Sequence, residues 1–377
     1  MTKLNNTYPS IWHLAERARK RIPFFAWEYL DSGTGMERLV ERNRAALDAV
    51  RMMPRVLSGR FAPNMSVTLL GETYSVPFGI APIGLSSLMW PEAELILAKA
   101  AQKNDIPYCL SMVANQTPER VTEFAPDRTW MQIYPPSKVE ILHDLLARSK
   151  AAGIKTIVIT VDVPASSTRE RQLAAGLTVP PKTTAKTLWR MAKRPAWLRQ
   201  TMAKGKPRFR TMESYFPEDQ MNEAAKLIAN IVDGRPDWDY LDIVRKAWDG
   251  NLIVKGVLSV EDAGKAITHG ADAIVVSNHG GRQFDAAPAS IKALPAIAEK
   301  VAKRVPVIFD SGIRGGLDIA RAIALGADFC LLGRAFLYSV AALGDEGGDH
   351  AYEILRNDLA NNMIQAGAKT LGDLTAL

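Results

Sequence analysis

The chain has 377 residues, of which 47% are hydrophobic and 23% charged, a composition that excludes disordered and fibrous proteins. Residues 182–210 hold ten Lys and Arg and no carboxylate, so the rest of the chain has 37 cations against 40 carboxylates. The basic charge therefore belongs to one segment, and not to a nucleic-acid-binding face spread over the fold.

The two cysteines, Cys109 and Cys330, lie singly in apolar runs. They form no metal-binding pair, which is typical of proteins from a reducing compartment. The first 21 residues are polar and charged, unlike a secretory signal. No apolar stretch reaches the roughly 18 residues that a membrane-spanning helix needs. We therefore expect neither a metal site nor a transmembrane helix.

Short apolar runs rich in Val and Ile are predicted as strands, because nearly continuous apolarity is typical of parallel strands covered on both faces. In chain order they are 76–81, 106–110, 130–134, 156–161, 252–256, 273–277, 305–310 and 329–333. Helical periodicity lies between several of them, at 91–103, 138–152, 260–270 and 317–326. This alternation predicts an α/β fold, a (β/α)8 TIM barrel, formed by residues 1–377 as a single domain.

A long inserted loop is expected after strand 4, because residues 162–251 are too many for one connection. We place the insertion at 178–215, where it contains the basic segment 182–210. Three interpretations of this segment stay open: a solvated lid, a nucleic-acid-binding segment without a supporting motif, and an interfacial membrane anchor. In the third, cations face anionic lipid while Trp189 and Trp197 enter the headgroup boundary.

Polar or glycine-rich groups follow the predicted strands, at the end of such barrels where chemistry takes place. In chain order they are Ala81-Pro82, Ser111, Gln132 and Tyr134, Thr160 and Asp162, Lys255, Ser277 and His279, Asp310, and Gly333-Arg334. Any one of them has an ordinary packing explanation. Together they favour a site that lines a polar cofactor.

Residues 277–283, with the sequence SNHGGRQ, are the strongest local motif. Of the five histidines, only His279 lies at a predicted strand end. Histidine can take up a proton near neutral pH, and Arg282 can hold a carboxylate through two hydrogen bonds. The alternative is a structural histidine in a glycine-rich turn.

The turns after the last two strands are typical of a phosphate site in this architecture. They are Asp310-Ser311-Gly312-Ile313-Arg314 and Gly333-Arg334. Ordinary turn glycines are the alternative, but the two arginines favour phosphate. Neither GxxxxGK[ST] nor GxGxxG occurs, so the pattern predicts a phosphate-bearing cofactor other than ATP or NAD.

These motifs resemble the FMN-dependent L-2-hydroxy acid oxidases and dehydrogenases, such as glycolate oxidase, L-lactate dehydrogenase and L-mandelate dehydrogenase. The resemblance extends over nearly the whole chain. It rests on YLDSG at 29–33, APIG at 81–84, QIY at 132–134, TVD at 160–162, RER at 169–171, VKG at 254–256, SNHGGRQ, DSGIR at 310–314 and LGR at 332–334. It implies FMN as the cofactor and oxidation of an L-2-hydroxy acid to the 2-keto acid. L-lactate is the first expected substrate, and a mandelate-type acid is the alternative.

The resemblance also implies residue roles. His279 would take the substrate proton, with Asp162 stabilising the resulting imidazolium, and Tyr134 would bind the substrate oxygen. Lys255 would lie near flavin N1. The substrate carboxylate would be held by Tyr29, Arg169 and Arg282. The cofactor would be contacted by Ala81, Pro82, Ile83, Gly84, Ser111, Gln132, Thr160, Lys255, Ser277, Asp310, Ser311, Gly312, Arg314, Gly333 and Arg334.

Some positions depart from glycolate oxidase. Val113, Ser166 and Gly84 resemble the lactate and mandelate dehydrogenases instead, and the small side chains at 113 and 166 would leave room for either substrate. Gln172 stands where the family often has Asp. Membrane-associated members carry an apolar, basic insertion where this chain has 182–210. The resemblance thus implies peripheral attachment to the cytoplasmic side of the inner membrane, a quinone acceptor with O2 as the alternative, and a homo-oligomer, expected to be a tetramer.

Two functional hypotheses outside this family stay open. A Schiff-base aldolase would use Lys255 as its nucleophile, and an RNA-binding protein on a barrel scaffold would use the basic segment. A flavin spectrum that bleaches when a 2-hydroxy acid is added would exclude both.

Overall fold

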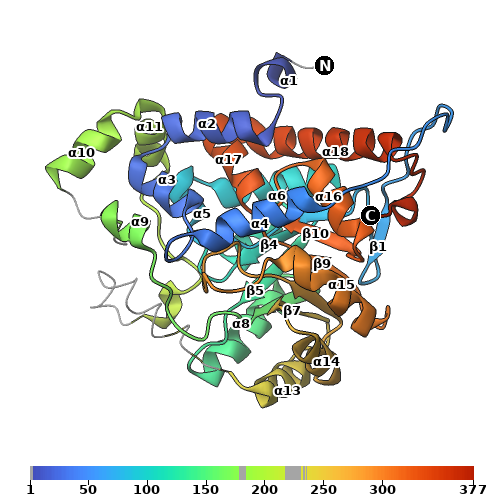
Figure 1. The fold of residues 1–377 in the computed structure, drawn as a ribbon. Coiled ribbons are helices and arrows are strands. Elements are labelled where there is room, and N and C mark those ends of the chain that lie inside the picture. The colour runs from blue at the N-terminus through green and yellow to red at the C-terminus, as the bar shows by residue number, and fades with distance from the viewer. Residues whose placement is uncertain (1–2, 178–183, 217–230, 232–233, 235) are drawn as a thin grey trace.

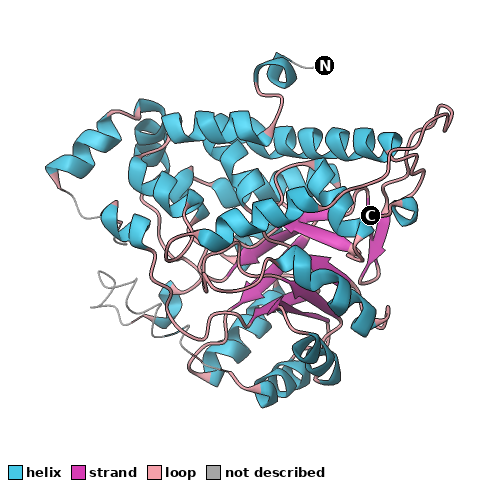
Figure 2. Cartoon of the chain, viewed as in Figure 1, coloured by secondary structure: helices cyan, strands magenta, loops and turns pink. Residues whose placement is uncertain are grey.

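The computed structural model describes residues 3–177, 184–216, 231, 234 and 236–377. Its centre is a closed barrel of parallel strands in the order β10-β3-β4-β5-β6-β7-β8-β9, surrounded by helices (Figure 1, Figure 2). The strands are β3 (Phe78–Ile80), β4 (Tyr108–Ser111), β5 (Thr129–Ile133), β6 (Thr156–Thr160), β7 (Asn251–Val257), β8 (Ala273–Val276), β9 (Val307–Phe309) and β10 (Phe329–Leu332). Each predicted strand is present, and the (β/α)8 barrel is confirmed.

Burial on two sides explains why the strands read as continuous apolar runs. One set of strand residues, including Cys109, Val158 and Ile253, forms a cluster inside the barrel. The alternate residues, such as Leu110 and Ile157, pack outward against the helices. Because neither face of these strands meets water, the pattern is largely apolar, and the polar Gln132 and Lys255 lie towards the carboxyl ends of β5 and β7.

The helices cover the outside of the barrel. Those that follow the strands are α6 (Ala93–Asn104), α7 (Pro118–Thr122), α8 (Val139–Ala151), α14 (Val260–Thr268), α15 (Ser290–Val301), α16 (Gly316–Ala324), α17 (Arg334–Leu343) and α18 (Gly347–Gln365), with α13 (Trp238–Ala247) before β7. The four helices predicted from periodicity agree with α6, α8, α14 and α16 to within a few residues. Within the described ranges, no helix is both long and apolar enough to cross a bilayer.

Two N-terminal features were not predicted. Helices α1 (Lys3–Thr7), α2 (Ile11–Arg21), α3 (Phe24–Asp31) and α4 (Arg38–Ala49) precede the barrel, and α3 brings the Tyr29–Gly33 segment to its catalytic end. An antiparallel pair, β1 (Val67–Leu69) and β2 (Glu72–Tyr74), forms a separate small sheet. The ring of Tyr74 packs against Trp130 and Phe329, which belong to the cluster inside the barrel.

The insertion follows β6, the fourth strand of the barrel, as expected. Helix α9 (Glu170–Ala174) comes before it, and its described elements include α10 (Ala185–Ala192), α11 (Pro195–Lys204) and the short η1 (Glu213–Tyr215). Figure 1 shows α10 projecting from the body of the protein, whereas α11 lies beside α2. Lys182, at the start of the basic segment, falls outside the described residues.

The two tryptophans of the insertion have different environments. Trp189 is 60% exposed on α10, with Leu188 beside it at 51%. Trp197 on α11 is only 3% exposed; its Nε1 donates to the Leu88 carbonyl over 3.1 Å, and its ring meets Phe25 edge to face. The expectation that Trp197 enters lipid is therefore wrong, because α11 buries this side chain in the core.

Candidate active site

A cavity of about 370 Å³ opens at the carboxyl ends of the barrel strands. Most predicted site residues line it: Tyr29, Ala81, Pro82, Ile83, Gly84, Tyr134, Thr160, Arg169, Lys255, His279, Arg282, Asp310, Ser311, Gly312, Arg314, Gly333 and Arg334. Ser111, Gln132, Asp162 and Ser277 stand behind this lining and bond to it or to one another. The fold thus gathers residues that are far apart in sequence around one space.

His279 lies just after β8 between two hydrogen-bonding partners. Its Nδ1 is 2.9 Å from Oδ1 of Asp162, and its Nε2 is 3.4 Å from the hydroxyl of Tyr134. The Asp162 carboxylate accepts a hydrogen bond from the Nδ1–H group and so fixes the ring. Nε2, on the side of Tyr134, is then the nitrogen available to take up a proton.

The electrostatics keep this group in the state of a base. Burial, together with the charges of Lys255 and Arg169, lowers the pKa of His279 below its usual value, although Asp162 opposes the shift. Burial acts to raise the pKa of Asp162, but the charges of His279 and Lys255 bring it below the usual range. Burial raises the pKa of Tyr134 to about 12, so its hydroxyl keeps its proton. At neutral pH, therefore, His279 is neutral and Asp162 ionised.

Lys255 is buried at the end of β7 with its charge compensated. Its Nζ donates to Ser277 Oγ over 2.9 Å and pairs with Asp310 Oδ2 at 3.2 Å. Burial acts to lower the pKa of Lys255, but Asp310 and Asp162 raise it above the usual value. The amine is therefore protonated at neutral pH, which disfavours the Schiff-base alternative. Ser311 Oγ donates to Asp310 over 2.7 Å and accepts from the Gly280 N–H over 3.0 Å, which ties the His279 turn to the same cluster.

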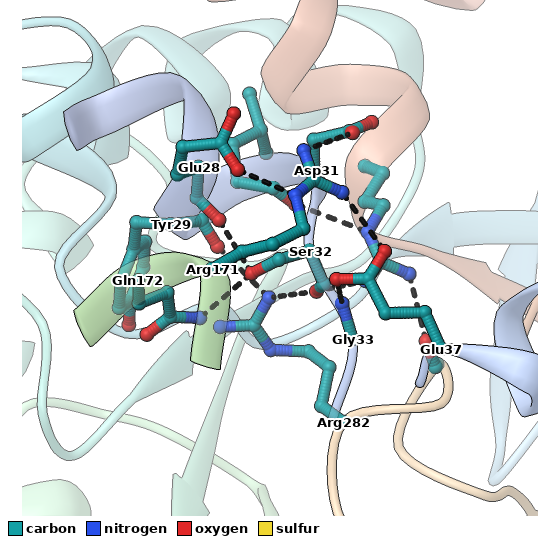
Figure 3. Close-up of polar contacts among 12 residues, drawn as sticks. Glu28, Tyr29, Asp31, Ser32, Gly33, Glu37, Arg171, Gln172 and Arg282 are labelled. Atoms are coloured by element: carbon teal, nitrogen blue, oxygen red, sulfur yellow. Dashed lines mark hydrogen bonds and ion pairs between the residues drawn. The ribbon is translucent and has the colours of Figure 1, made fainter. Parts of the chain in front are cut away.

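Four arginines converge on the cavity without a carboxylate partner within the described part of the chain. Arg169 donates to Ser167 Oγ and Gln283 Oε1, and Arg314 donates to its neighbouring carbonyl. Arg282 and Arg334 donate to main-chain carbonyls of the Tyr29–Gly33 segment, and both use the Ser32 carbonyl, at 2.9 and 2.8 Å (Figure 3 shows the Arg282 bonds).

These contacts hold the guanidinium groups in place and leave their charges unneutralised. Burial, reinforced by the charges of Arg169 and Arg334, lowers the pKa of Arg282 to about 9. Burial likewise lowers the pKa of Arg314. A half-buried cluster of cations without carboxylate partners in the described part of the chain is a site for anionic groups of a ligand, because an anion offsets the electrostatic cost of burying the charges.

Three carboxylates of the N-terminal segment that Arg282 and Arg334 contact are paired with Arg171 (Figure 3). The Arg171 guanidinium contacts Glu28 at 2.5 Å, Glu37 at 2.9 Å and Asp31 at 3.0 Å. These ion pairs dock α9 on α3, and Gln172 Nε2 strengthens the contact by donating to Ser32 Oγ over 3.0 Å. The departure from Asp at position 172 is thus accommodated by a neutral hydrogen bond.

Sequence reasoning missed several lining residues. Phe209, from the insertion, is 5% exposed and contributes to the wall, although no strand-end motif marks it. Gln283 lies inside the SNHGGRQ motif but received no role. Ser166 is exposed and is not among the residues that line the cavity. Val113 does line it, and a Cβ at Gly84 would come within 2.6 Å of Val113 Cγ2. The glycine at 84 and the valine at 113 therefore fit each other.

Comparisons with known proteins agree with this arrangement. A family model described as FMN-dependent dehydrogenase matches residues 18–377. The L-lactate dehydrogenase of Ectopseudomonas mendocina is 37% identical over 362 residues, which cover 95% of each chain. That of Acinetobacter baylyi is 35% identical over 361 residues and covers 95% of this chain and 94% of its own.

Solved structures show the same fold. The crystal structure of the monotopic membrane protein (S)-mandelate dehydrogenase superposes with a TM-score of 0.92 at 32% identity, covering 97% of each chain. A variant of mandelate oxidase, solved with 2-hydroxy-phenylacetamide, gives a TM-score of 0.82 at 30% identity and covers 98% of each chain.

Proposed function

Since the chain belongs to the FMN-dependent dehydrogenase family and is an FMN-dependent oxidoreductase of 2-hydroxy acids, we propose that it oxidises L-lactate to the 2-keto acid in the cavity at the barrel end. The observation that carries this assignment is the juxtaposition of a neutral His279 with half-buried arginines that have no carboxylate partner among the described residues. A base and a carboxylate-binding cation are the two groups that proton removal from a 2-hydroxy acid requires.

The residues present fit FMN. Gln132 supports the fit directly: its Oε1 accepts from Ser111 Oγ over 2.9 Å, while its buried Nε2 has no partner among the residues that the structure describes and remains a donor for a polar ring edge. Ala81 to Gly84 and Thr160 would contact the ring, and Ser277 would support it through Lys255. The phosphate would be held by the turns with Arg314 and Arg334, which include Asp310, Ser311, Gly312 and Gly333. Bound FMN supplies an acceptor for the two electrons that the substrate loses.

The chain's own groups handle the carboxylate and the proton. Arg282, Arg169 and the Tyr29 hydroxyl would bind the substrate carboxylate. The Tyr134 hydroxyl, protonated at neutral pH, would donate to the substrate oxygen. His279 would take the proton at Nε2, while Asp162 stabilises the resulting imidazolium at Nδ1.

The base assignment predicts the pH dependence of substrate reduction of the flavin. Because only neutral His279 accepts a proton, kcat/KM falls as the pH drops through the pKa of this group. That pKa is lowered from the usual value of about 6.5, so we expect the acid limb below pH 6.5. Asp162→Asn removes the charge that raises the pKa of His279 and should move the limb lower still, with a slower rate. Stopped-flow measurements of flavin reduction across pH test both the wild-type limb and its shift in Asp162→Asn. An acid limb above pH 6.5 in the wild type would contradict the assignment of His279 as the base.

A comparison of kcat/KM for three hydroxy acids can identify the side chain of the substrate. Identity of 37% to L-lactate dehydrogenases favours L-lactate, whereas the TM-score of 0.92 to (S)-mandelate dehydrogenase and the apolar wall of Val113 and Phe209 favour a mandelate-type acid. Flavin reduction measured with L-lactate, L-mandelate and glycolate separates them by kcat/KM. The same panel, run with O2 and with a quinone analogue, separates oxidase from dehydrogenase activity.

We also propose a location and an electron acceptor. The enzyme would attach peripherally to the cytoplasmic side of the inner membrane and pass its electrons to a quinone. Support comes from the exposed Leu188 and Trp189 on the projecting α10 and from the similarity to a monotopic membrane protein. The membrane contact belongs to segment 182–210 within the proposed insertion at 178–215. We also propose a homo-oligomer, a tetramer, which analytical ultracentrifugation tests.

The membrane contact predicts a loss of vesicle binding when α10 becomes polar. Fully burying a large apolar side chain contributes about 1.5–3 kcal/mol, so Leu188→Ser with Trp189→Ser should weaken partitioning at least about ten-fold. Ile243→Ser is the matched control, because Ile243 is 41% exposed on α13, away from α10. Flotation with phosphatidylglycerol-containing vesicles measures the effect. Equal binding by the α10 variant and the wild type would remove α10 from the contact.

A further inference from the structure

A second cavity, of about 510 Å³, lies between α2 and the turn that joins α10 to α11. Five cations line it: Arg17, Lys20 and Arg21 from α2, and Lys193 and Arg194 from the turn. Glu16 is the one carboxylate in the lining. The net charge of this wall is therefore strongly positive, and it has no part in the reaction proposed above.

The arginines of this cavity are fixed but not neutralised. Arg17 donates to the Ala342 carbonyl over 2.8 Å, Arg21 to the Ala341 carbonyl over 3.2 Å, and Arg194 to the Ile22 carbonyl over 3.0 Å. Within the described part of the chain, none of these three pairs with a carboxylate. Because carbonyl bonds orient a guanidinium without removing its charge, the cluster is prepared for an anion.

Two other cations of the insertion are neutralised. Lys204 pairs with Glu92 at 2.8 Å, and Arg208 pairs with Glu213 at 2.7 Å. The charge of these two groups is therefore not available to an anion, whereas that of Arg194 in the cavity is.

Arg21 shows how firmly the cluster is held. Its guanidinium lies 3.7 Å from the ring centre of Trp90. Burial, then the charge of Arg17, lowers the pKa of Arg21 to about 10, while the carboxylate of Asp345 acts in the opposite direction. The cluster thus carries an electrostatic cost that a bound anion would offset.

The position of the cavity indicates which anion it meets. Lys193 Nζ lies 3.4 Å from the ring centre of Trp189, the exposed tryptophan of α10. Figure 1 shows α10 projecting outward from the end of α11 beside α2. If Trp189 enters the headgroup boundary, as tryptophan does at membrane surfaces, the cavity at the base of α10 lies at the level of the lipid phosphates.

We propose that this cavity binds the phosphodiester headgroup of an anionic phospholipid. The assignment rests on the proposed membrane attachment and adds to it a discrete lipid site. Arg17, Lys20 and Lys193 are exposed and would meet the headgroup, while the half-buried Arg21 and Arg194 would bind its phosphate from deeper in the cavity. The fixed guanidinium groups distinguish this site from a diffuse basic surface.

The test compares two charge-matched variants. The cavity pair is Lys20→Gln with Lys193→Gln. The control pair is Arg199→Gln with Lys206→Gln, which removes two exposed cations of the insertion outside the cavity. A cation near an anionic surface strengthens binding about five-fold, so diffuse attraction predicts the same loss, about 25-fold, for both pairs. A discrete site predicts a loss at least about ten-fold larger for the cavity pair on phosphatidylglycerol vesicles, and little change on phosphatidylcholine vesicles.

A soluble short-chain lipid tests binding to the cavity in the absence of a membrane. Dihexanoyl-phosphatidylglycerol below its micelle concentration should raise the Tm of the wild type and of the control pair, but not of the cavity pair. Inorganic phosphate at the same concentration should give no such rise. Equal vesicle losses for the two pairs, a retained Tm rise in the cavity pair, or an equal rise with phosphate would each overturn the lipid site. If the wild type binds no vesicles but its Tm rises with the soluble lipid, the proposed membrane attachment would be refuted and the lipid-binding cavity would be supported.

Discussion

His279→Asn is expected to leave FMN bound and to slow flavin reduction by the hydroxy acid by about 10² to 10⁴-fold, the usual contribution of a general base. The amide cannot accept the proton, while the turns proposed to bind the phosphate should remain unchanged. His279 has a φ of +57°, in the left-handed region, and Asn tolerates this conformation better than most residues. The turn that carries the side chain should therefore survive the substitution.

Anaerobic stopped-flow absorbance measures the reduction, and the flavin spectrum of the purified protein measures FMN content. His143→Asn is the control, because His143 is exposed on α8 and does not line the cavity. A His279→Asn enzyme reduced at a near wild-type rate would exclude His279 as the base. Loss of FMN from this variant would instead show that the turn is needed to build the cofactor site.

Arg282→Lys is expected to raise KM and slow reduction together, lowering kcat/KM by about 10² to 10³-fold. One guanidinium nitrogen of Arg282 donates to the carbonyls of Tyr29 and Ser32, at 2.8 and 2.9 Å, which leaves the other donors for a carboxylate. Lysine concentrates its donors on one nitrogen, so it cannot hold the α3 segment and also make a two-pronged contact. A hydrogen bond to a charged group contributes about 1.5–3 kcal/mol, and more than one is lost.

Arg42→Lys is the matched control for this substitution. Arg42 on α4 also donates to two main-chain carbonyls, those of Asp285 and Ala287, but it does not line the cavity. A similar loss of Tm in both variants, with a loss of kcat/KM only in Arg282→Lys, separates substrate binding from support of the fold. An unchanged KM in Arg282→Lys would remove this residue from the carboxylate site.

The barrel and its strand-end residues were predictable because one physical constraint repeats eight times. A parallel strand buried on both faces must be apolar, and it ends where polar side chains first reach the cavity. Thr160 at the end of β6 and Lys255 within β7 are found by this rule alone. The exact limits of the strands were not predicted. β3 begins at Phe78 and not at Val76, because its first pairing with β10 joins Phe78 to Cys330.

What escaped sequence analysis depends on contacts between distant segments. Trp189 and Trp197 lie eight residues apart in equally basic surroundings, but only Trp197 meets Phe25, from a helix near the N-terminus. Phe209 lines the cavity only because the chain returns to the barrel after α11. The ion pairs of Arg171 likewise need carboxylates from Glu28 to Glu37, more than a hundred residues away. Local pattern contains none of this information.

The arginines around the cavity link folding to the supply of cofactor. Without an anion, their mutual repulsion acts against the folded state, and the Ser32 carbonyl shared by Arg282 and Arg334 relieves only part of it. A ligand that binds only the folded protein stabilises it by mass action, by about 4 kcal/mol when its free concentration exceeds Kd a thousand-fold. We therefore expect FMN to act on this chain as a folding ligand as well as a redox group, and the amount of folded protein in a cell to follow its flavin pool.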